Sequence, residues 1–230
     1  MNTIFFVLGP ESSGNHITSW ILTQMGCFGD PQVTTNYHQI MGDSQRLDEF
    51  INGPVGDIRE IVEPEKPLVY FQSVPHGKRW PDVIGIRSVF LDAGYRMKSI
   101  LVVRDWYANI QSNYYHRTKT DKIADSEELL MEQWRWIGER LQHLKPFMFF
   151  NSSLLFKDPA SAVLGLEIFT GLKWPYDHFK MIWDVDRKQH TLLKERGYGD
   201  FDKEGKEALQ ALAKKERANK SSVFPDGIKR

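Results

Sequence analysis

The residues best suited to chemistry lie near the start of the chain, in the segment TIFFVLGPESSGNHITSWIL (residues 3–22). An apolar run that ends at Leu8 leads into a Gly-Pro pair and a Ser/Gly loop, and a helical pattern begins near His16. A strand, a loop of small residues and a helix N-terminus direct backbone N–H groups, with their partial positive charge, at one point. This pattern predicts a cradle for a phosphate-bearing ligand.

The loop differs from the Walker A motif of enzymes that hydrolyse ATP or GTP. That motif ends in Gly-Lys-Ser/Thr, whereas Gly14 is followed here by Asn15 and His16. The lysine and hydroxyl that such enzymes place on the phosphates and on Mg²⁺ are therefore missing from the loop. We expect the ligand to be held mainly by backbone N–H groups of Ser12, Ser13, Gly14, Asn15 and His16.

A second segment with chemical potential covers residues 100–117, ILVVRDWYANIQSNYYHR. A buried strand ends at Arg104, and Ser112 lies eight positions further, about two turns along the helix expected to follow. Ligands bind beyond the carboxyl ends of strands in open parallel sheets, so Arg104 should reach the same edge as the loop. Its planar guanidinium suits a phosphate, and Ser112 could add a hydroxyl hydrogen bond. The alternative is that Arg104 pairs with a nearby carboxylate and Ser112 is an ordinary residue of the helix surface.

Both segments resemble motifs of the sulfotransferases that use 3′-phosphoadenosine 5′-phosphosulfate (PAPS) as donor. Residues 12–16 are similar to the first motif of that family, which binds the 5′-phosphosulfate, and Arg104 and Ser112 match the second, which holds the 3′-phosphate. A third segment, NSSLLFKDPASAVLGLEIFTGL (residues 151–172), is similar to the family's late strand, Asp-Pro turn and helix. The resemblance covers residues 3–190 and implies PAPS as donor, adenosine 3′,5′-bisphosphate (PAP) as product, and no metal.

Two positions depart from the family's pattern. Many members place a lysine just before the Ser/Gly-Gly of the loop, where it meets the transferring sulfonate, but this chain has Ser12 there, preceded by Glu11. Ser12 is kept as a catalytic candidate, and the identity of the residue that stabilises the leaving group stays open. The other departure is Trp106, which occupies a position where proline is usual.

The general base is expected just after the second strand, in FQSVPHGKRWPD (residues 71–82). The family often carries a histidine here, close to a proline, and His76 directly follows the proline of this chain. Imidazole titrates near neutral pH, which suits proton transfer from an acceptor hydroxyl. Lys78 could supply the cation that is missing at Ser12. For both residues the alternative is an exposed turn without a catalytic role.

Weaker features complete the set of candidates. His16, at the expected helix N-terminus, could contact the sulfonate or the 5′-phosphate. Arg187 lies in an Asp-Arg-Lys run that resembles a basic segment with which some members close over the nucleotide, although a solvated charge cluster explains it nearly as well. Trp134 and Trp136 fit core and surface positions better than a substrate platform.

The composition limits the class of protein. A length of 230 residues is enough for one α/β domain with a full core. Thirty basic and thirty acidic residues give a net charge of zero, which argues against nucleic acid as a partner and against a polybasic membrane anchor. Cys27 is the single cysteine, so no intrachain disulfide can form. Because the apolar runs are too short to span a bilayer and no signal peptide is visible, we expect a soluble, cytoplasmic protein.

Strand and helix patterns alternate along the chain. Strands are expected at residues 3–9, 67–74, 98–103 and 147–151, and helices at 14–26, 44–51, 55–62, 81–93, 107–117, 127–144 and from Asp158-Pro159 to Gly171. This alternation predicts an α/β fold of three layers, with a mostly parallel central sheet and helices on both faces, as in the P-loop-like sulfotransferases. We expect one domain over residues 1–230, with a charged helical tail from about residue 203.

These observations together favour a PAPS-dependent sulfotransferase that acts by in-line displacement. The acceptor is expected to be a hydroxyl on a carbohydrate or small metabolite, and the sequence does not choose between them. One alternative is a nucleotide or small-molecule kinase, which the missing Gly-Lys-Ser/Thr disfavours. The other is a non-catalytic nucleotide-binding protein on the same scaffold, which Ser12 in place of lysine keeps open.

Overall fold

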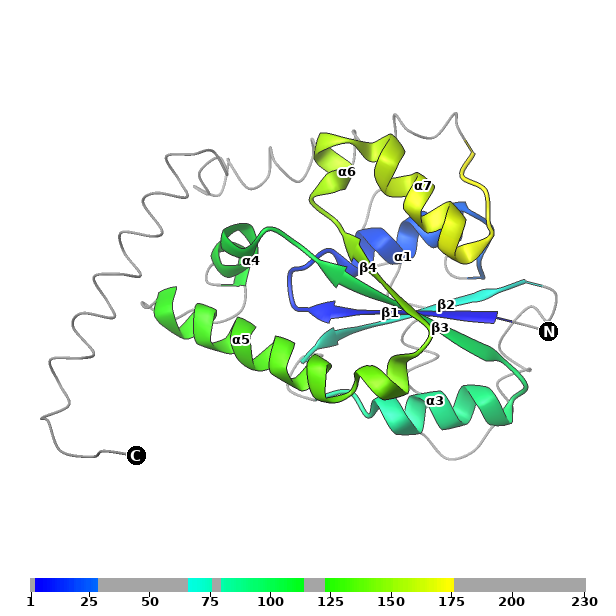
Figure 1. The fold of residues 1–230 in the computed structure, drawn as a ribbon, viewed down its shortest axis with the longest axis horizontal. Helices are drawn as coiled ribbons and strands as arrows, with labels where there is room; N and C mark the ends of the chain where they lie inside the picture. The colour runs from blue at the N-terminus through cyan, green and yellow to red at the C-terminus, as the bar shows by residue number, and fades with distance from the viewer. Residues whose placement is uncertain (1–2, 29–65, 76–79, 114–122, 176–230) are drawn as a thin grey trace, which may run out of the picture.

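The structure is a computed structural model, and it describes residues 3–28, 66–75, 80–113 and 123–175 (Figure 1). Within these segments four strands form one sheet: β1 (Thr3–Pro10), β2 (Leu68–Val74), β3 (Arg96–Val103) and β4 (Phe147–Asn151). The order is β2-β1-β3-β4 and every neighbouring pair is parallel. The carboxyl ends of all four strands therefore lie at the same edge of the sheet.

Helices cover both faces of the sheet (Figure 1). They are α1 (Asn15–Gln24), α3 (Val83–Asp92), α4 (Trp106–Asn113), α5 (Ile123–Glu139), a 3₁₀ helix (Leu141–Leu144), α6 (Leu154–Lys157) and α7 (Pro159–Thr170). Helices α1 and α7 pack on one face and α3 and α5 on the other. The predicted three-layer architecture with a parallel central sheet is thus confirmed.

The uninterrupted apolar sequence of β1 follows from its central position. Phe5 and Val7 face the core shared with α1 and α7, whereas Phe6 and Leu8 face the core shared with α3 and α5. Successive side chains of a strand point to opposite faces, and both faces are covered here, so both sets of residues must be apolar. All four of these side chains are almost completely buried.

The predicted element boundaries agree with the structure to within a few residues, with two differences. The helix expected at 127–144 begins earlier, at Ile123, and ends at Glu139, after which the chain continues as a 3₁₀ turn. Gly138, a poor helix former, lies at the point where the α-helix ends. Helix α6 was not predicted, because four residues are too few for a periodic signal.

Several predictions fall outside the described residues. These are the helices at 44–51 and 55–62, the end of the helix at 107–117, and the charged tail from about residue 203. The single-domain organisation of the whole chain stays a prediction as well. In the described segments, no helix combines the length and the apolar character needed to cross a membrane.

Candidate phosphate and nucleotide site

The loop between β1 and α1 has the backbone geometry of an anion cradle. Ser12 (φ 63°) and Gly14 (φ 104°) both adopt left-handed backbone conformations, which turn successive peptide N–H groups toward one side. Gly14 is the N-cap residue of α1 and supplies no side-chain cap, and the first turn of the helix contains no acidic residue. The partial positive charge of the helix N-terminus is therefore not offset by a capping side chain or a carboxylate of its own first turn.

Two of the predicted ligand residues brace this loop through their side chains. Ser13 Oγ donates to Pro10 O at 2.7 Å, and Asn15 Nδ2 donates to Gly9 O at 3.0 Å and Pro10 O at 3.2 Å. Asn15 Nδ2 also lies 3.3 Å from Ser73 Oγ, which ties the loop to β2. Ser13 and Asn15 are almost completely buried, and these bonds of their side chains hold the loop in shape.

A serine that the sequence analysis did not single out as a site residue holds the loop from the other side. Ser152, directly after β4, donates from Oγ to Ser13 O at 2.5 Å, and its own N–H donates to Val103 O at 2.8 Å. A Cβ on Gly14 would lie 2.8 Å from Ser152 Cβ, closer than such atoms approach. Gly14 is thus required both by its positive φ and by the packing of Ser152 against it. The signal available in the sequence was only the position of Ser152 at the end of a strand.

Arg104 reaches the loop, as predicted from its position at the end of β3. Its Nη1 donates to Ser12 O at 2.9 Å, and the side chain is half-buried. Next to it, Asp105 Oδ1 accepts a hydrogen bond from Ala108 N at 3.1 Å, which caps the start of α4. The same helix carries Ser112, half-buried near its far end. The strand end, the loop and α4 therefore meet at the carboxyl edge of the sheet.

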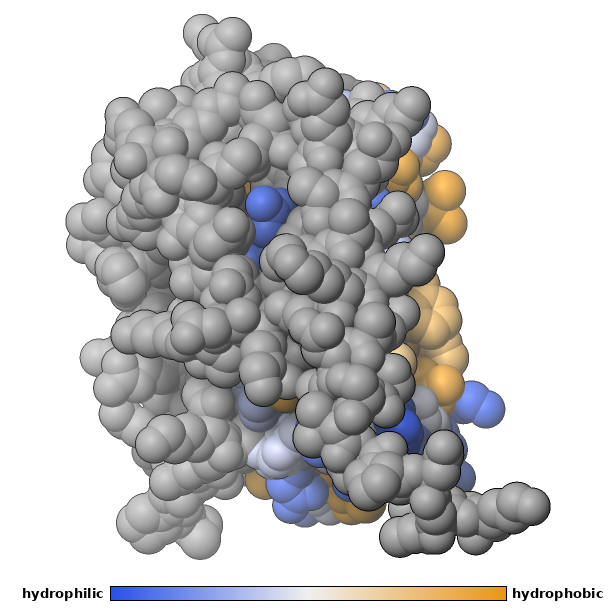
Figure 2. Space-filling model, turned by 90° about the vertical axis from the view of Figure 1, so that its left-hand side faces the viewer, coloured by the Kyte–Doolittle hydropathy of each residue, from blue (hydrophilic) through white to orange (hydrophobic). Residues whose placement is uncertain are grey.

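Figure 2 shows the molecule from the side toward which the strands point in Figure 1. The described residues visible in that view are hydrophilic near its centre and mostly hydrophobic along its right-hand side. His16, in the first turn of α1, is half-buried with its ring centroid 4.4 Å from that of Phe71 on β2. Among the segments that the structure describes, no group of three or more His, Cys, Asp or Glu is placed to hold a metal ion.

The remaining candidates fall outside the described residues. These are His76 as general base, Lys78 as the substitute cation and Arg187 as a nucleotide contact. Their roles stay predictions. The structure brings together Ser12, Ser13, Gly14, Asn15, His16 and Arg104, and it places Ser112 on the helix that begins beside Arg104.

Comparison with known proteins gives matches in structure only. No protein family model and no curated protein sequence matches the chain. The sulfotransferase domain of the Synechococcus PCC 7002 olefin synthase is 18% identical, with a TM-score of 0.47, and the match covers 75% of this chain and 74% of that one. Retinol dehydratase, in complex with androsterone and PAP, is 12% identical, with a TM-score of 0.49, over 100% of this chain and 83% of that one.

Proposed function

We propose that the chain is a sulfotransferase that moves a sulfuryl group from PAPS to a hydroxyl of a carbohydrate or small-molecule acceptor. The observation that carries this proposal is the contact between Arg104 and the loop at Ser12. A cationic fork at the end of β3 lies beside an uncapped helix N-terminus at the end of β1. A nucleotide donor with phosphates at both the 5′ and the 3′ position could place one phosphate at the helix N-terminus and the other at the guanidinium of Arg104.

The proposed binding mode assigns the two ends of the donor to different elements. The Ser13 N–H donates to Pro10 O at 3.2 Å, so the other N–H groups of residues 12–16 would hold the 5′-phosphosulfate, and Arg104 with Ser112 would hold the 3′-phosphate. His76 would accept the proton of the attacking hydroxyl, while His16, Lys78 and Arg187 would add positive or hydrogen-bonding groups around the transferring sulfonate and nucleotide. In the transfer, the acceptor oxygen forms the new S–O bond as the bond from sulfur to the 5′-phosphate oxygen breaks, and PAP leaves.

Ligand-dependent thermal unfolding tests the proposal without requiring the acceptor. PAP, ATP and adenosine 5′-phosphate are added separately to the full-length protein, and the melting temperature is measured for each. A ligand that binds only the folded state stabilises it by about 2.7 kcal/mol at 100 times its Kd, so selective binding of PAP should raise the melting temperature most. Equal shifts with PAP and adenosine 5′-phosphate would contradict a 3′-phosphate site, and a larger shift with ATP would favour the kinase alternative.

A further inference from the structure

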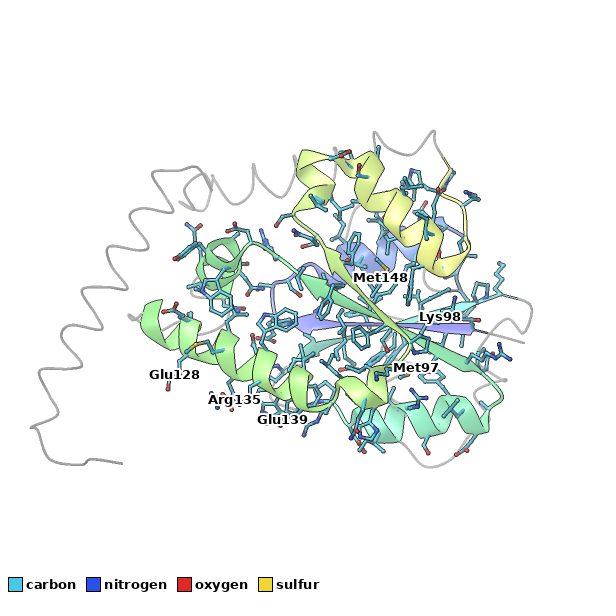
Figure 3. The ribbon with its side chains drawn as sticks, viewed as in Figure 1. Met97, Lys98, Glu128, Arg135, Glu139 and Met148 are labelled. Carbon is cyan, nitrogen blue, oxygen red and sulfur yellow. The ribbon has the colours of Figure 1, made fainter. Side chains whose placement is uncertain are left out.

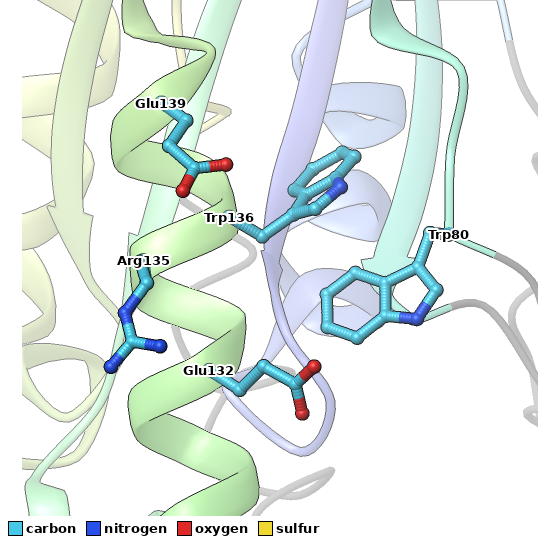
Figure 4. A pocket seen from close by; sticks show the side chains of 5 residues that line it. All are labelled: Trp80, Glu132, Arg135, Trp136 and Glu139. Carbon is cyan, nitrogen blue, oxygen red and sulfur yellow. The ribbon is translucent and has the colours of Figure 1, made fainter.

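A groove lies along α5, between this helix and the segment that leads into α3. Its volume is about 320 Å³, and the described residues that line it are Trp80, Glu132, Arg135, Trp136 and Glu139 (Figure 4). The last four come from α5 in two adjacent rows, Glu132 with Trp136 and Arg135 with Glu139, each pair four residues apart. Trp80 comes from the segment that leads into α3, on the other side of the groove.

Two indole rings form the apolar part of this groove. The ring centroids of Trp80 and Trp136 lie 5.7 Å apart, with 41° between the ring planes. Trp80 remains 38% exposed, which is high for the largest and one of the most apolar side chains. An exposed aromatic surface beside polar side chains is typical of a ligand or partner site.

Trp136 is held in place by a neighbouring arginine. The guanidinium carbon of Arg140 lies 4.2 Å from the centroid of the Trp136 ring, and Arg140 Nη1 donates to Trp136 O at 3.0 Å. The same Nη1 lies 3.2 Å from Glu139 Oε2, so Glu139 already has a cationic partner. A ring fixed in this way loses little conformational freedom when a ligand packs on it.

The two remaining charged groups of the groove have opposite signs. In the described part of the chain, neither Glu132 nor Arg135 takes part in an ion pair, although they lie only three residues apart on the same helix. Figure 4 shows Glu132 pointing from α5 toward Trp80, with Arg135 on the opposite flank of the helix face. The groove therefore offers one hydrogen-bond acceptor, one fork of donors and no net charge.

We propose that this groove binds a neutral carbohydrate chain. An organic cation would be attracted by Glu132 and the indoles but repelled by Arg135, whereas an anion would be attracted by Arg135 but repelled by Glu132. A sugar chain suits this pattern: one unit would pack its C–H face on the indole of Trp80 and donate hydroxyl hydrogen bonds to Glu132, and hydroxyls of a further unit would accept from Arg135. The open shape of the groove suits a chain of several sugar units rather than one enclosed molecule.

The groove indicates the class of acceptor for the proposed sulfuryl transfer. This assignment of the acceptor rests on the proposed function. Trp80 lies four positions after His76, the predicted general base, so the aromatic wall begins close in sequence to the predicted reaction centre. We assign the groove as a subsite for an oligosaccharide acceptor, which would anchor sugar units beyond the one that receives the sulfuryl group. Binding at such a subsite needs neither PAPS nor PAP.

Titration of the full-length protein with oligosaccharides tests the assignment. The probes are maltotetraose, cellotetraose and chitotetraose, and binding is followed by tryptophan fluorescence and by calorimetry. At least one probe should bind, with millimolar or tighter affinity. Trp80→Ala should weaken that binding by about tenfold or more, because loss of a central aromatic contact is among the costliest changes at a binding surface. Trp80→Phe, which keeps a ring, should retain more of the affinity.

Matched variants on the same helix separate the groove from general effects. Glu132→Gln should weaken binding, whereas Glu128→Gln, the same change one turn earlier on α5 and outside the groove lining, should not (Figure 3). Met131→Ala removes another exposed apolar side chain of α5 and serves as the control for Trp80→Ala. Thermal unfolding of each variant shows that the fold is retained.

The results separate this inference from the proposed function. The groove assignment is overturned if none of the three probes binds at tens of millimolar, if Trp80→Ala and Glu132→Gln bind as the unmodified protein does, or if tetramethylammonium binds in preference to the sugars. PAP binding, measured on the same preparations, tests the nucleotide site independently. Oligosaccharide binding without PAP binding would sustain the groove and contradict the sulfotransferase, and the converse would sustain the sulfotransferase alone.

Discussion

Arg104 has a structural role in the loop beside its proposed role in binding the ligand. Its Nη1 donates to Ser12 O, and its planar guanidinium suits a phosphate. This dual role matters for any mutation at the position. Loss of the side chain removes the proposed phosphate contact and also one of the bonds that fix the loop.

Arg104→Ala is expected to weaken PAP binding by about tenfold or more, since a charge-assisted hydrogen bond contributes roughly 1.5–3 kcal/mol. Adenosine 5′-phosphate lacks the 3′ group, so its affinity should fall much less. Calorimetric titration with both ligands measures the difference. Arg87→Ala is the control, because Arg87 donates only to the carbonyls of His143 and Lys145, away from the loop. Equal losses for both ligands would mean that Arg104 acts only by holding Ser12.

Cys27 is expected to be chemically inert in the folded protein. Burial raises the pKa of its thiol from 9.0 to about 12, so the reactive thiolate is scarcely populated near neutral pH. Reaction with a disulfide reagent at pH 8 should be slow in the native protein and fast in denaturant. Because the unfolded thiol ionises first, the free energy of unfolding should fall as the pH rises above about 9. Rapid native-state labelling would show that Cys27 is accessible.

At the scale of elements, the loop depends on three strand ends. Ser73 of β2, Arg104 after β3 and Ser152 after β4 each form a hydrogen bond with the loop that follows β1. The loop is therefore preorganised by its neighbours rather than by its own sequence alone. Such support keeps N–H groups in place before a ligand arrives, which lowers the entropic cost of binding.

Ser152→Ala is expected to destabilise the fold and loosen the loop together. The change removes the hydrogen bond to Ser13 O in a buried site, which typically costs about 0.5–1.5 kcal/mol of unfolding free energy. PAP affinity should fall as well, although Ser152 is not proposed to touch the ligand. Chemical denaturation and PAP titration measure the two effects, with Ser88→Ala on the exposed side of α3 as control. Unchanged PAP affinity in a destabilised variant would contradict the preorganisation argument.

At the scale of the whole molecule, the sheet order brings the residues of the proposed nucleotide site to one edge, and the groove lies along one of the helices that cover the sheet. The parallel strands end together at the loop, and α5 packs its buried stripe against the sheet beneath them. The exposed residues Glu132, Arg135 and Glu139, together with Trp136 at the edge of this core, form the groove with Trp80. One helix thus supports the core with its buried residues and offers a binding surface with its more exposed ones.

Sulfuryl transfer is expected to proceed without a divalent metal. The proposed loop and cationic side chains can neutralise the donor directly, whereas phosphoryl transfer from ATP normally relies on Mg²⁺. Turnover with PAPS and an oligosaccharide acceptor should be the same with EDTA as with added Mg²⁺. Activity that is abolished by EDTA and restored by Mg²⁺ would point to the kinase alternative instead.

The sequence by itself determined the elements and the short-range parts of the site. The strands are continuous apolar runs, so the local pattern of residues was sufficient to predict them. Arg104 and Ser112 lie within one strand-helix unit, so their spacing was also readable from the local sequence. The positive-φ loop was also visible as a run of small residues. What the sequence could not do was assign a role to Ser13 and Asn15, whose side chains brace the loop rather than face outward.

Only the tertiary structure decided which distant residues meet. Arg104 and Ser12 are 92 positions apart, Ser152 and Ser13 are 139 apart, and both contacts depend on the strand order β2-β1-β3-β4. The sequence of α5 alone is consistent with Trp136 as an ordinary surface residue, and only the tertiary structure shows that Trp80, from another part of the chain, packs against it. Periodicity reports which face of an element is buried, but it carries no information on which element covers that face, because that choice is made by packing among all of them.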